Sequence, residues 1–253
     1  MACNSNSDGK FNHRKNHFAR IYQLEEATAK IIEIGEEAGI AGLSAKADDA
    51  CGALPVGTFE EVVDYSQAHA SLTRLMNIAK QRFAYAVTVI LSEKPDCKAA
   101  IMLVADEWGK NIKIPADYSA EQVFGWIADN ILDSMPCDKT KAVIENGEAF
   151  KWLQLEDTYK TFFDAVKGDV AVYREFEETL LNAALSDNAL NYSIDHPSVM
   201  GIFEGDYGCE EPTGDSPDVI VKATGGYDIV MPDELATNMG LDVESLLTIG
   251  ILK

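Results

Sequence analysis

The chain has 253 residues and a mass of 27.6 kDa, and 47% of its residues are hydrophobic, which is enough to fill a core. Its formal net charge is −21 and its pI about 4.4, yet only 25% of the residues are charged, so the acidity comes from a shortage of Lys and Arg. A charge of this sign repels nucleic acid and anionic membranes, and neither is expected as a direct partner.

The five cysteines are far apart and form no Cys-x-x-Cys pair, so the sequence implies neither a disulfide framework nor a zinc knuckle. The first ten residues lack the apolar segment of a signal peptide. The longest apolar stretch, Phe83–Leu91, has about half the length that spans a bilayer. We therefore expect a protein that is not secreted by a signal peptide and is located in the cytoplasm or in a virion.

The charge is unevenly distributed, because residues 1–20 carry a net +3 and the remainder of the chain −24. Residues 1–19 are rich in Asn, Ser, Lys and His and show no hydrophobic period, so they are predicted to form a basic flexible arm. A basic arm before an acidic body suits contact with another acidic surface, such as a neighbouring copy. The candidate interaction residues are Lys10, Arg14, Lys15 and Arg20.

A helical body is predicted over residues 20–190. Its first helix begins at Arg20 and ends near Gly39, where glycines interrupt the pattern. Apolar or small residues recur there at three- and four-residue steps, at Leu24, Thr28, Ile31, Ile34 and Ala38. Residues 41–57, with Gly, Pro and small side chains, are predicted to be a connector.

The next helix is predicted to begin at the capping box Thr58-Phe-Glu-Glu61 and to run to about Leu91. Its last part, residues 84–91, is rich enough in β-branched residues to form a strand, but no turn signal precedes it and the helical interpretation is preferred. His69 falls on the apolar stripe, which predicts a hydrogen-bonded core histidine, with a ligand or a catalytic base as the alternative.

Pro95 fits the first turn of a helix over residues 96–108, with Gly109 as its left-handed C′ residue. A second capping box, Ser119-Ala-Glu-Gln122, begins another helix. Its predicted buried residues are Val123, Trp126, Ile127, Ile131 and Leu132. Shorter helices are predicted over residues 139–145, 148–167 and 170–185.

The pattern changes after the body. Residues 191–217 are predicted to be an acidic Gly/Pro-rich loop region, and residues 218–253 a small hairpin-helix module. In this module two β-branched runs flank Thr224-Gly-Gly226, a hairpin signal, and short helices are predicted over residues 232–239 and 242–249. The predicted fold class is mainly α: a multi-helix bundle body with a small C-terminal α+β appendage.

Within that module, residues 219–241 combine a hairpin with the sequences Met231-Pro-Asp-Glu-Leu235 and Met239-Gly-Leu241. This segment locally resembles the swapped-hairpin DNA-binding domains of the AbrB type. Those domains present basic side chains to phosphates, whereas this segment sets Lys222 against four acidic residues. The resemblance therefore implies no function here.

The densest group of potential metal ligands lies in the acidic loop region, around Asp195, His196 and Asp206. Carboxylates on a Gly-rich loop suit Ca²⁺ or Mg²⁺, but the spacing is not that of an EF-hand, and a solvated acidic loop is the preferred interpretation. No Gly-x-Ser-x-Gly motif and no phosphate-binding loop is present. The sequence thus assigns no catalytic, cofactor-binding or metal residue and predicts no cofactor.

These observations favour a protein that is not an enzyme. The preferred hypothesis is a structural or assembly subunit of a larger complex, for example a phage virion component such as a head-to-tail adaptor or a decoration protein. Its expected partner is a protein, either further copies of itself or other members of a larger assembly. The alternatives are a metal-dependent hydrolase that uses the Asp195/His196/Asp206 loop, and an acidic mimic or inhibitor of a nucleic-acid-binding protein.

Overall fold

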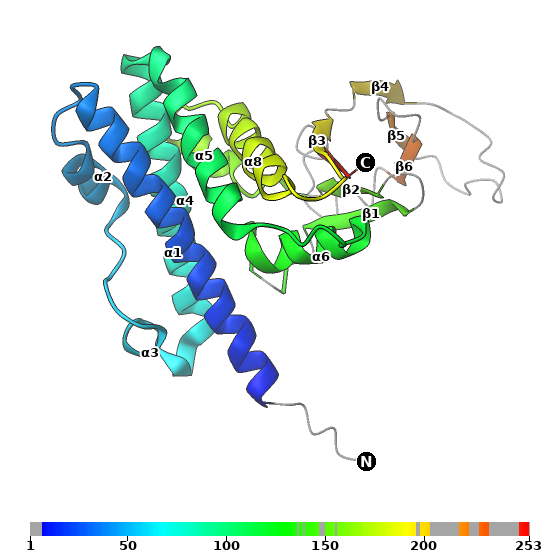
Figure 1. The fold of residues 1–253 in the computed structure, drawn as a ribbon, viewed down its shortest axis with the longest axis horizontal. Coiled ribbons are helices and arrows are strands. Elements are labelled where there is room, and N and C mark those ends of the chain that lie inside the picture. Colours follow the sequence, from blue (N-terminus) through cyan, green and yellow to red (C-terminus); the bar gives the residue numbers. More distant parts are fainter. Residues whose placement is uncertain are drawn as a thin grey trace. The chain divides into compact units, whose positions relative to one another are not determined.

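The computed structural model of the chain describes the helices and strands and some of the segments that connect them (Figure 1). The described residues are 7–135, 137–138, 140–146, 150–154, 156–195, 198–202, 218–222, 228–232 and 248–252. They fall into two compact units, one formed by residues 1–138 and 158–189 and the other by residues 139–157 and 190–253. The first unit is helical, and the prediction of a mainly-α fold is confirmed.

The described helices of the first unit pack along one another, with α1 beside α4 and α5 beside α8 (Figure 1). They are α1 (Ser7–Glu37), α2 (Leu43–Cys51), α3 (Phe59–Val62), α4 (Ala68–Glu93), α5 (Lys98–Ile112), α6 (Ala120–Asn130), α7 (Lys160–Ala165) and α8 (Ala171–Ala184), with 3-10 turns at Tyr65–Gln67 and Pro95–Cys97. Within the described residues no helix is both long and apolar enough to cross a membrane.

Helix α1 starts thirteen residues before the predicted position, because Ser7 and not Arg20 is its first residue. The prediction of a flexible arm is therefore wrong from Ser7 onward. The buried face of α1 continues toward the N-terminus through His17, which is fully buried. The helical period is hidden in the sequence because the residues before Arg20 are mostly polar. The predicted end is confirmed: α1 stops at Glu37, and Gly39 adopts a φ of 98°, a conformation that favours glycine.

The region after α1 contains more short elements than predicted. The supposed connector over residues 41–57 includes α2, which buries Leu43 and Ala47 one turn apart. The capping box at Thr58 is confirmed, but α3 ends at Val62. The Asp64 carboxylate then accepts a hydrogen bond of 2.9 Å from the Ser66 amide and begins a separate turn, so the predicted single helix is divided. Residues 84–91 are helical, as preferred.

Gly109 has a different role from the predicted one. It lies inside α5, which continues to Ile112, and it is buried against α8. A Cβ atom at this position would lie 2.2 Å from the Leu180 carbonyl oxygen and 2.7 Å from the Ala183 Cβ atom. The missing side chain therefore allows the backbones of α5 and α8 to approach closely.

Helix α6 follows its prediction except at one residue. The Ser119 and Gln122 side chains and amides form the reciprocal bonds of the capping box, at 3.3 and 2.9 Å. The predicted core positions other than Trp126 are buried. Trp126 is only half-buried, because the inward stripe of this short helix is carried by Val123 and Ile127.

The second unit contains two antiparallel sheets. The first sheet has the order β1-β2-β7-β3, with β1 (Lys141–Asn146), β2 (Phe150–Gln154), β7 (Thr248–Leu252) and β3 (Tyr192–Asp195). Strands β1 and β2 occupy positions predicted to be helical, so the helix predictions for residues 139–145 and for the first part of 148–167 are wrong. Strand β7 lies between β2 and β3, and pairing with this distant segment overrides the local helical pattern.

An aromatic contact spans this sheet. The rings of Trp152 and Tyr192 stack with centroids 5.7 Å apart, although their strands are separated by β7. Gly250, predicted to stop a helix, pairs with Trp152 in the sheet and presents no side chain between the two rings. The helix predicted over residues 242–249 is wrong at Thr248 and Ile249, which belong to β7, and its other positions lie outside the described residues.

The second sheet has the order β4-β5-β6, with β4 (Ser198–Ile202), β5 (Asp218–Lys222) and β6 (Asp228–Pro232). Strands β5 and β6 pair antiparallel, with Val219 opposite Met231 and Val221 opposite Ile229. The pairing of the predicted hairpin is therefore confirmed. The predicted short helix over residues 232–239 lies outside the described residues, apart from Pro232 at the end of β6.

Candidate interaction surface

Aromatic side chains attach the N-terminal half of α1 to the segment around α3. Phe18 of α1 lies 4.4 Å from Tyr22 and 5.6 Å from Phe59, measured between ring centroids. Phe59 in turn contacts Tyr65 edge-to-face at 5.6 Å. Such pairs contribute about 0.5–1.5 kcal/mol each beyond the area that they bury. The four rings thus fix α3 and the following turn against α1.

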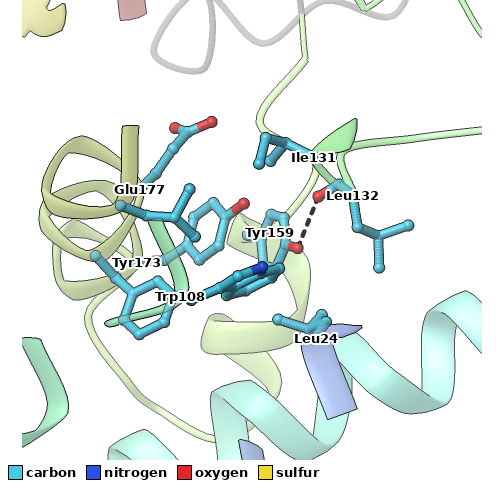
Figure 2. A pocket seen from close by; sticks show the side chains of 9 residues that line it. Leu24, Trp108, Ile131, Leu132, Tyr159, Tyr173 and Glu177 are labelled. Atoms are coloured by element: carbon cyan, nitrogen blue, oxygen red, sulfur yellow. Dashed lines mark hydrogen bonds between the residues drawn. The ribbon is translucent and has the colours of Figure 1, made fainter. Parts of the chain in front are cut away.

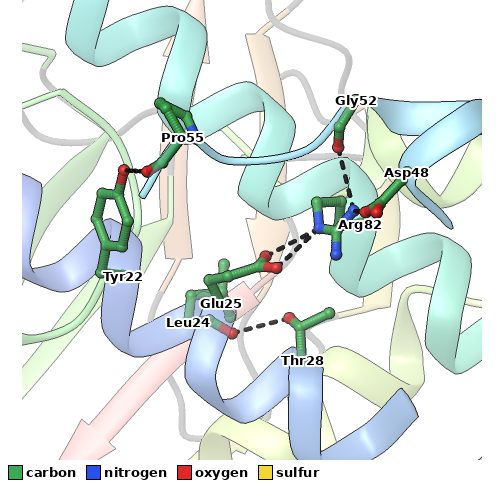
Figure 3. Close-up of polar contacts among 8 residues, drawn as sticks. All are labelled: Tyr22, Leu24, Glu25, Thr28, Asp48, Gly52, Pro55 and Arg82. Atoms are coloured by element: carbon green, nitrogen blue, oxygen red, sulfur yellow. Dashed lines mark hydrogen bonds and ion pairs between the residues drawn. The ribbon is translucent and has the colours of Figure 1, made fainter. Parts of the chain in front are cut away.

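Polar contacts support the same junction. Lys15 forms an ion pair with Glu60, and its Nζ atom lies 5.9 Å from the centroid of the Phe59 ring. The Tyr22 hydroxyl donates a hydrogen bond of 2.5 Å to the Pro55 carbonyl oxygen (Figure 3). The loop before α3 and α3 itself are therefore each tied to α1.

This junction also carries exposed apolar side chains. Val56 is fully exposed and Tyr65 is 47% exposed, and they are two of the four large hydrophobic side chains exposed among the described residues. Arg14 is exposed on α1 and forms no ion pair with a described residue. We call the group Arg14, Lys15, Pro55, Val56 and Tyr65 the α1-end surface. Exposed apolar groups beside charged groups are typical of sites that bind other proteins.

The structure places the four residues predicted to form an interaction arm in different environments. Lys10 lies on α1, one turn before Arg14, but its side chain is outside the described residues. Arg14 and Lys15 belong to the α1-end surface. Arg20 does not: it is buried, and its Nη1 atom donates to the carbonyl oxygens of Ala128 at 2.7 Å and Ile131 at 3.4 Å. Its long side chain caps the end of α6 and is not available to a partner.

A group of basic side chains is buried on α1 and α4. His17 is 0% exposed, and neither ring nitrogen has a hydrogen-bond partner among the described residues. Lys80 is 1% exposed and donates to the carbonyl oxygens of Asp133 and Thr158, while its Nζ atom lies 4.4 Å from the Tyr159 ring centroid. Burial lowers the pKa of His17 to about 3, assisted by the nearby positive charges of Arg20 and Lys80 and by His69.

The histidine prediction is therefore reversed. His69, predicted to be in the core, is exposed, because Ala68 takes the inward position in the first turn of α4. His17, predicted to belong to a flexible arm, is the buried one. Its position four residues before Ile21 and seven before Leu24 was the signal that could have identified it.

A second buried basic group lies further along the same pair of helices (Figure 3). The Nε atom of Arg82 donates to both carboxylate oxygens of Glu25, at 2.9 and 3.1 Å. Its Nη1 atom pairs with Asp48 and donates to the Gly52 carbonyl oxygen at 3.1 Å. Burial raises the pKa of Glu25, and Arg82 opposes that rise. This network joins α1 and α2 to α4, and the Arg82 guanidinium holds these helices together through charge-assisted hydrogen bonds.

The aromatic core of the first unit leaves little room for a ligand (Figure 2). The rings of Tyr159 and Tyr173 stack at 3.5 Å, and the Tyr159 hydroxyl donates to the Leu132 carbonyl oxygen at 2.9 Å. Burial raises the pKa of both tyrosines. The adjoining cavity, which Trp108 and Glu177 also line, measures about 10 Å³. A cavity of that size holds at most one water molecule.

Two of the three residues on which the hydrolase hypothesis depends lie outside the described residues. Asp195 is the last residue of β3, where its backbone pairs with Ile249, but its side chain is not described. His196 and Asp206 are both outside the described residues. Within the part of the chain that is described, no three His, Cys, Asp or Glu side chains lie close enough to hold a metal ion.

A scan against protein-family models and searches of curated proteins and solved structures found no match to this chain. The local resemblance of residues 219–241 to the AbrB-type domains is thus not accompanied by a family match, and we build nothing on it.

Proposed function

We propose that the protein is a non-enzymatic subunit of a larger assembly and that the α1-end surface is where it docks. The observation that carries the proposal is the exposure of Val56 and Tyr65 on a junction that four aromatic rings hold to α1, the helix that also exposes Arg14. Complete burial of an exposed Val side chain stabilises a complex by about 1.5–3 kcal/mol. A rigid support reduces the entropy lost on binding.

Charge favours an acidic partner, and a second copy of this chain is the first candidate. Residues 1–20 carry +3 and the rest of the chain −24, so the basic end of α1 is attracted by the body of a neighbour. Lys15 is already paired with Glu60, which leaves Arg14 as the described cation best placed for a new contact. A phage virion component, such as a head-to-tail adaptor or a decoration protein, is one form of this proposal.

The test compares two exposed apolar residues. Val56→Asp should lower the mass-average oligomeric state measured by light scattering across a concentration series. Leu103→Asp is the matched control, because Leu103 is 60% exposed on α5 and does not belong to the α1-end surface. An equal loss of association in both variants would contradict the proposal. The proposal would also be contradicted if the native chain stays monomeric and no partner protein binds it more tightly than it binds the Val56→Asp variant.

Electron microscopy of the purified protein at high concentration tests the assembly class itself. Rings, shells or filaments are expected if copies of the chain associate. A field of single small particles at every concentration would direct the search toward a different partner protein and would overturn self-assembly as the form of the proposal.

A further inference from the structure

We infer that His17 is an acid-sensitive latch, which holds the first turns of α1 on α4 while its imidazole is neutral and releases them when it takes up a proton. The geometry behind this inference is unusual. The side chain is completely buried, and both ring nitrogens lack a hydrogen-bond partner among the described residues. Buried polar groups are nearly always bonded, and an unbonded one calls for a physical explanation.

The surroundings of His17 are unfavourable for a positive charge. Arg20 lies on the same helix, and Lys80 and His69 are contributed by α4; all three act electrostatically on the imidazole and disfavour its protonation. The carboxylates of Asp129 and Asp133, from α6 and the residues after it, act on Arg20. Lys80 is held by carbonyl oxygens and cannot move away easily. A proton on His17 therefore introduces a buried cation among other cations, without an acceptor.

Two kinds of described contact oppose release on the N-terminal side, one an ion pair and the other aromatic. The ion pair between Lys15 and Glu60 is partly exposed, with 40% and 48% of the two side chains accessible, and exposed pairs of this kind contribute little to stability. Phe18 adds its contacts with Tyr22 and Phe59. On the C-terminal side, Ile21 is fully buried and Arg20 is bonded to α6. The segment that opens is thus the part of α1 up to about residue 19.

The size of the pH effect on opening follows from the difference between the pKa of His17 in the open and in the closed state. An exposed imidazole has a pKa near 6.5, whereas burial and the neighbouring charges lower that of His17 to about 3. Between these values the opening constant should rise up to tenfold per pH unit as the pH falls. From pH 7.5 to pH 5.0 the expected increase is about 30-fold.

Release would change the α1-end surface, because it separates Lys15 from Glu60 and uncovers Phe59. Acid would then control docking through this surface, and that consequence rests on the proposed function. The opening itself is a property of the single chain and does not depend on any partner.

The test is amide hydrogen exchange of the full chain at pH 7.5 and pH 5.0, with rates corrected for the chemical effect of pH. The opening constant of amides at residues 13–19 should rise about 30-fold, while those of α8 change much less. His17→Leu should remove the increase. His13→Ala is the matched control, because His13 is exposed one turn earlier on the same helix, and it should retain the full response.

Nuclear magnetic resonance of the His17 ring gives a second readout that needs no variant. The ring should stay neutral in the native chain at pH 5.0, where exposed histidines are already protonated. An opening constant that does not change with pH, an equal response in His17→Leu, or a His17 ring that titrates near pH 6.5 in the closed state would each overturn the latch. Failure of docking at pH 7.5 would leave it intact, so the two proposals fail separately.

Discussion

The two halves of α1 differ in how their buried polar side chains are bonded. In the C-terminal half, Glu25 meets Arg82, whose donors bond to carboxylates and to a carbonyl oxygen. In the N-terminal half, His17 is 0% exposed and has no bonded partner among the described residues. Burial of a polar group stabilises only when its bonds are made. The C-terminal half is therefore anchored to α4 by bonds that are made, whereas the N-terminal half buries an unbonded imidazole and is sensitive to added charge.

The largest expected effect comes from breaking the anchored half. Arg82→Met leaves Glu25, whose side chain is only 20% exposed, without its partner, and the free energy of unfolding should fall by about 3 kcal/mol. Urea denaturation measures this change. Lys98→Met is the control, because Lys98 and Glu175 are each 47% exposed and their pair should contribute less than about 1 kcal/mol. Similar losses in the two variants would contradict the distinction between buried and exposed pairs.

The next effect is the pH dependence of the other half. The pKa of His17 is lowered in the folded chain, so the unfolded chain binds more protons below pH 6.5. The stability from His17 is fully present above pH 6.5 and is lost as the pH falls toward about 3. Between pH 7.5 and 5.0 the loss should be about 2 kcal/mol. His17→Leu should be that much less sensitive to pH in urea denaturation, and an unchanged slope would refute the assignment.

The smallest effect concerns the aromatic contacts of the N-terminal half. Phe18→Ala should cost about 1 kcal/mol, because Phe18 is half-buried and loses its contacts with Tyr22 and Phe59. Its main consequence should be local, namely faster amide exchange at the start of α1, with little change in α8. Leu24→Ala in the anchored half should instead cost about 3 kcal/mol, since Leu24 is 1% exposed. Equal costs would mean that the two halves are equally packed.

Local signals in the sequence predicted the elements that depend on them. The capping boxes at Thr58 and Ser119 and the hairpin of β5 and β6 each require only residues within a short stretch. Strand β2 was missed because its second partner, β7, lies about one hundred residues away and nothing in the local pattern reveals it. Strand β1 pairs only with the neighbouring β2, so it depends on that distant pairing indirectly. Pairing of strands that are so distant in the sequence is set by the whole fold and overrides local propensity.

The candidate site was predicted only in part. Its basic character at Arg14 and Lys15 was visible in the composition of the first twenty residues. The exposure of Val56 and Tyr65 was not, because it depends on the Tyr22–Pro55 bond and on the packing of Phe59. Arg20 was misjudged for the same reason: a long basic side chain looks exposed in a sequence until the carbonyl oxygens that it bonds are known.

Charge reversal on α1 tests the central claim most directly. In a double variant, Lys10→Glu with Arg14→Glu, the basic end of the helix becomes acidic while His17 and the aromatic contacts remain. The mass from light scattering should fall relative to the native chain at 0.15 M salt, and the difference should shrink at 1 M salt, where the Debye length decreases from about 8 to about 3 Å. Identical masses for the two proteins at both salt concentrations, with the native chain associated, would contradict docking through the α1-end surface.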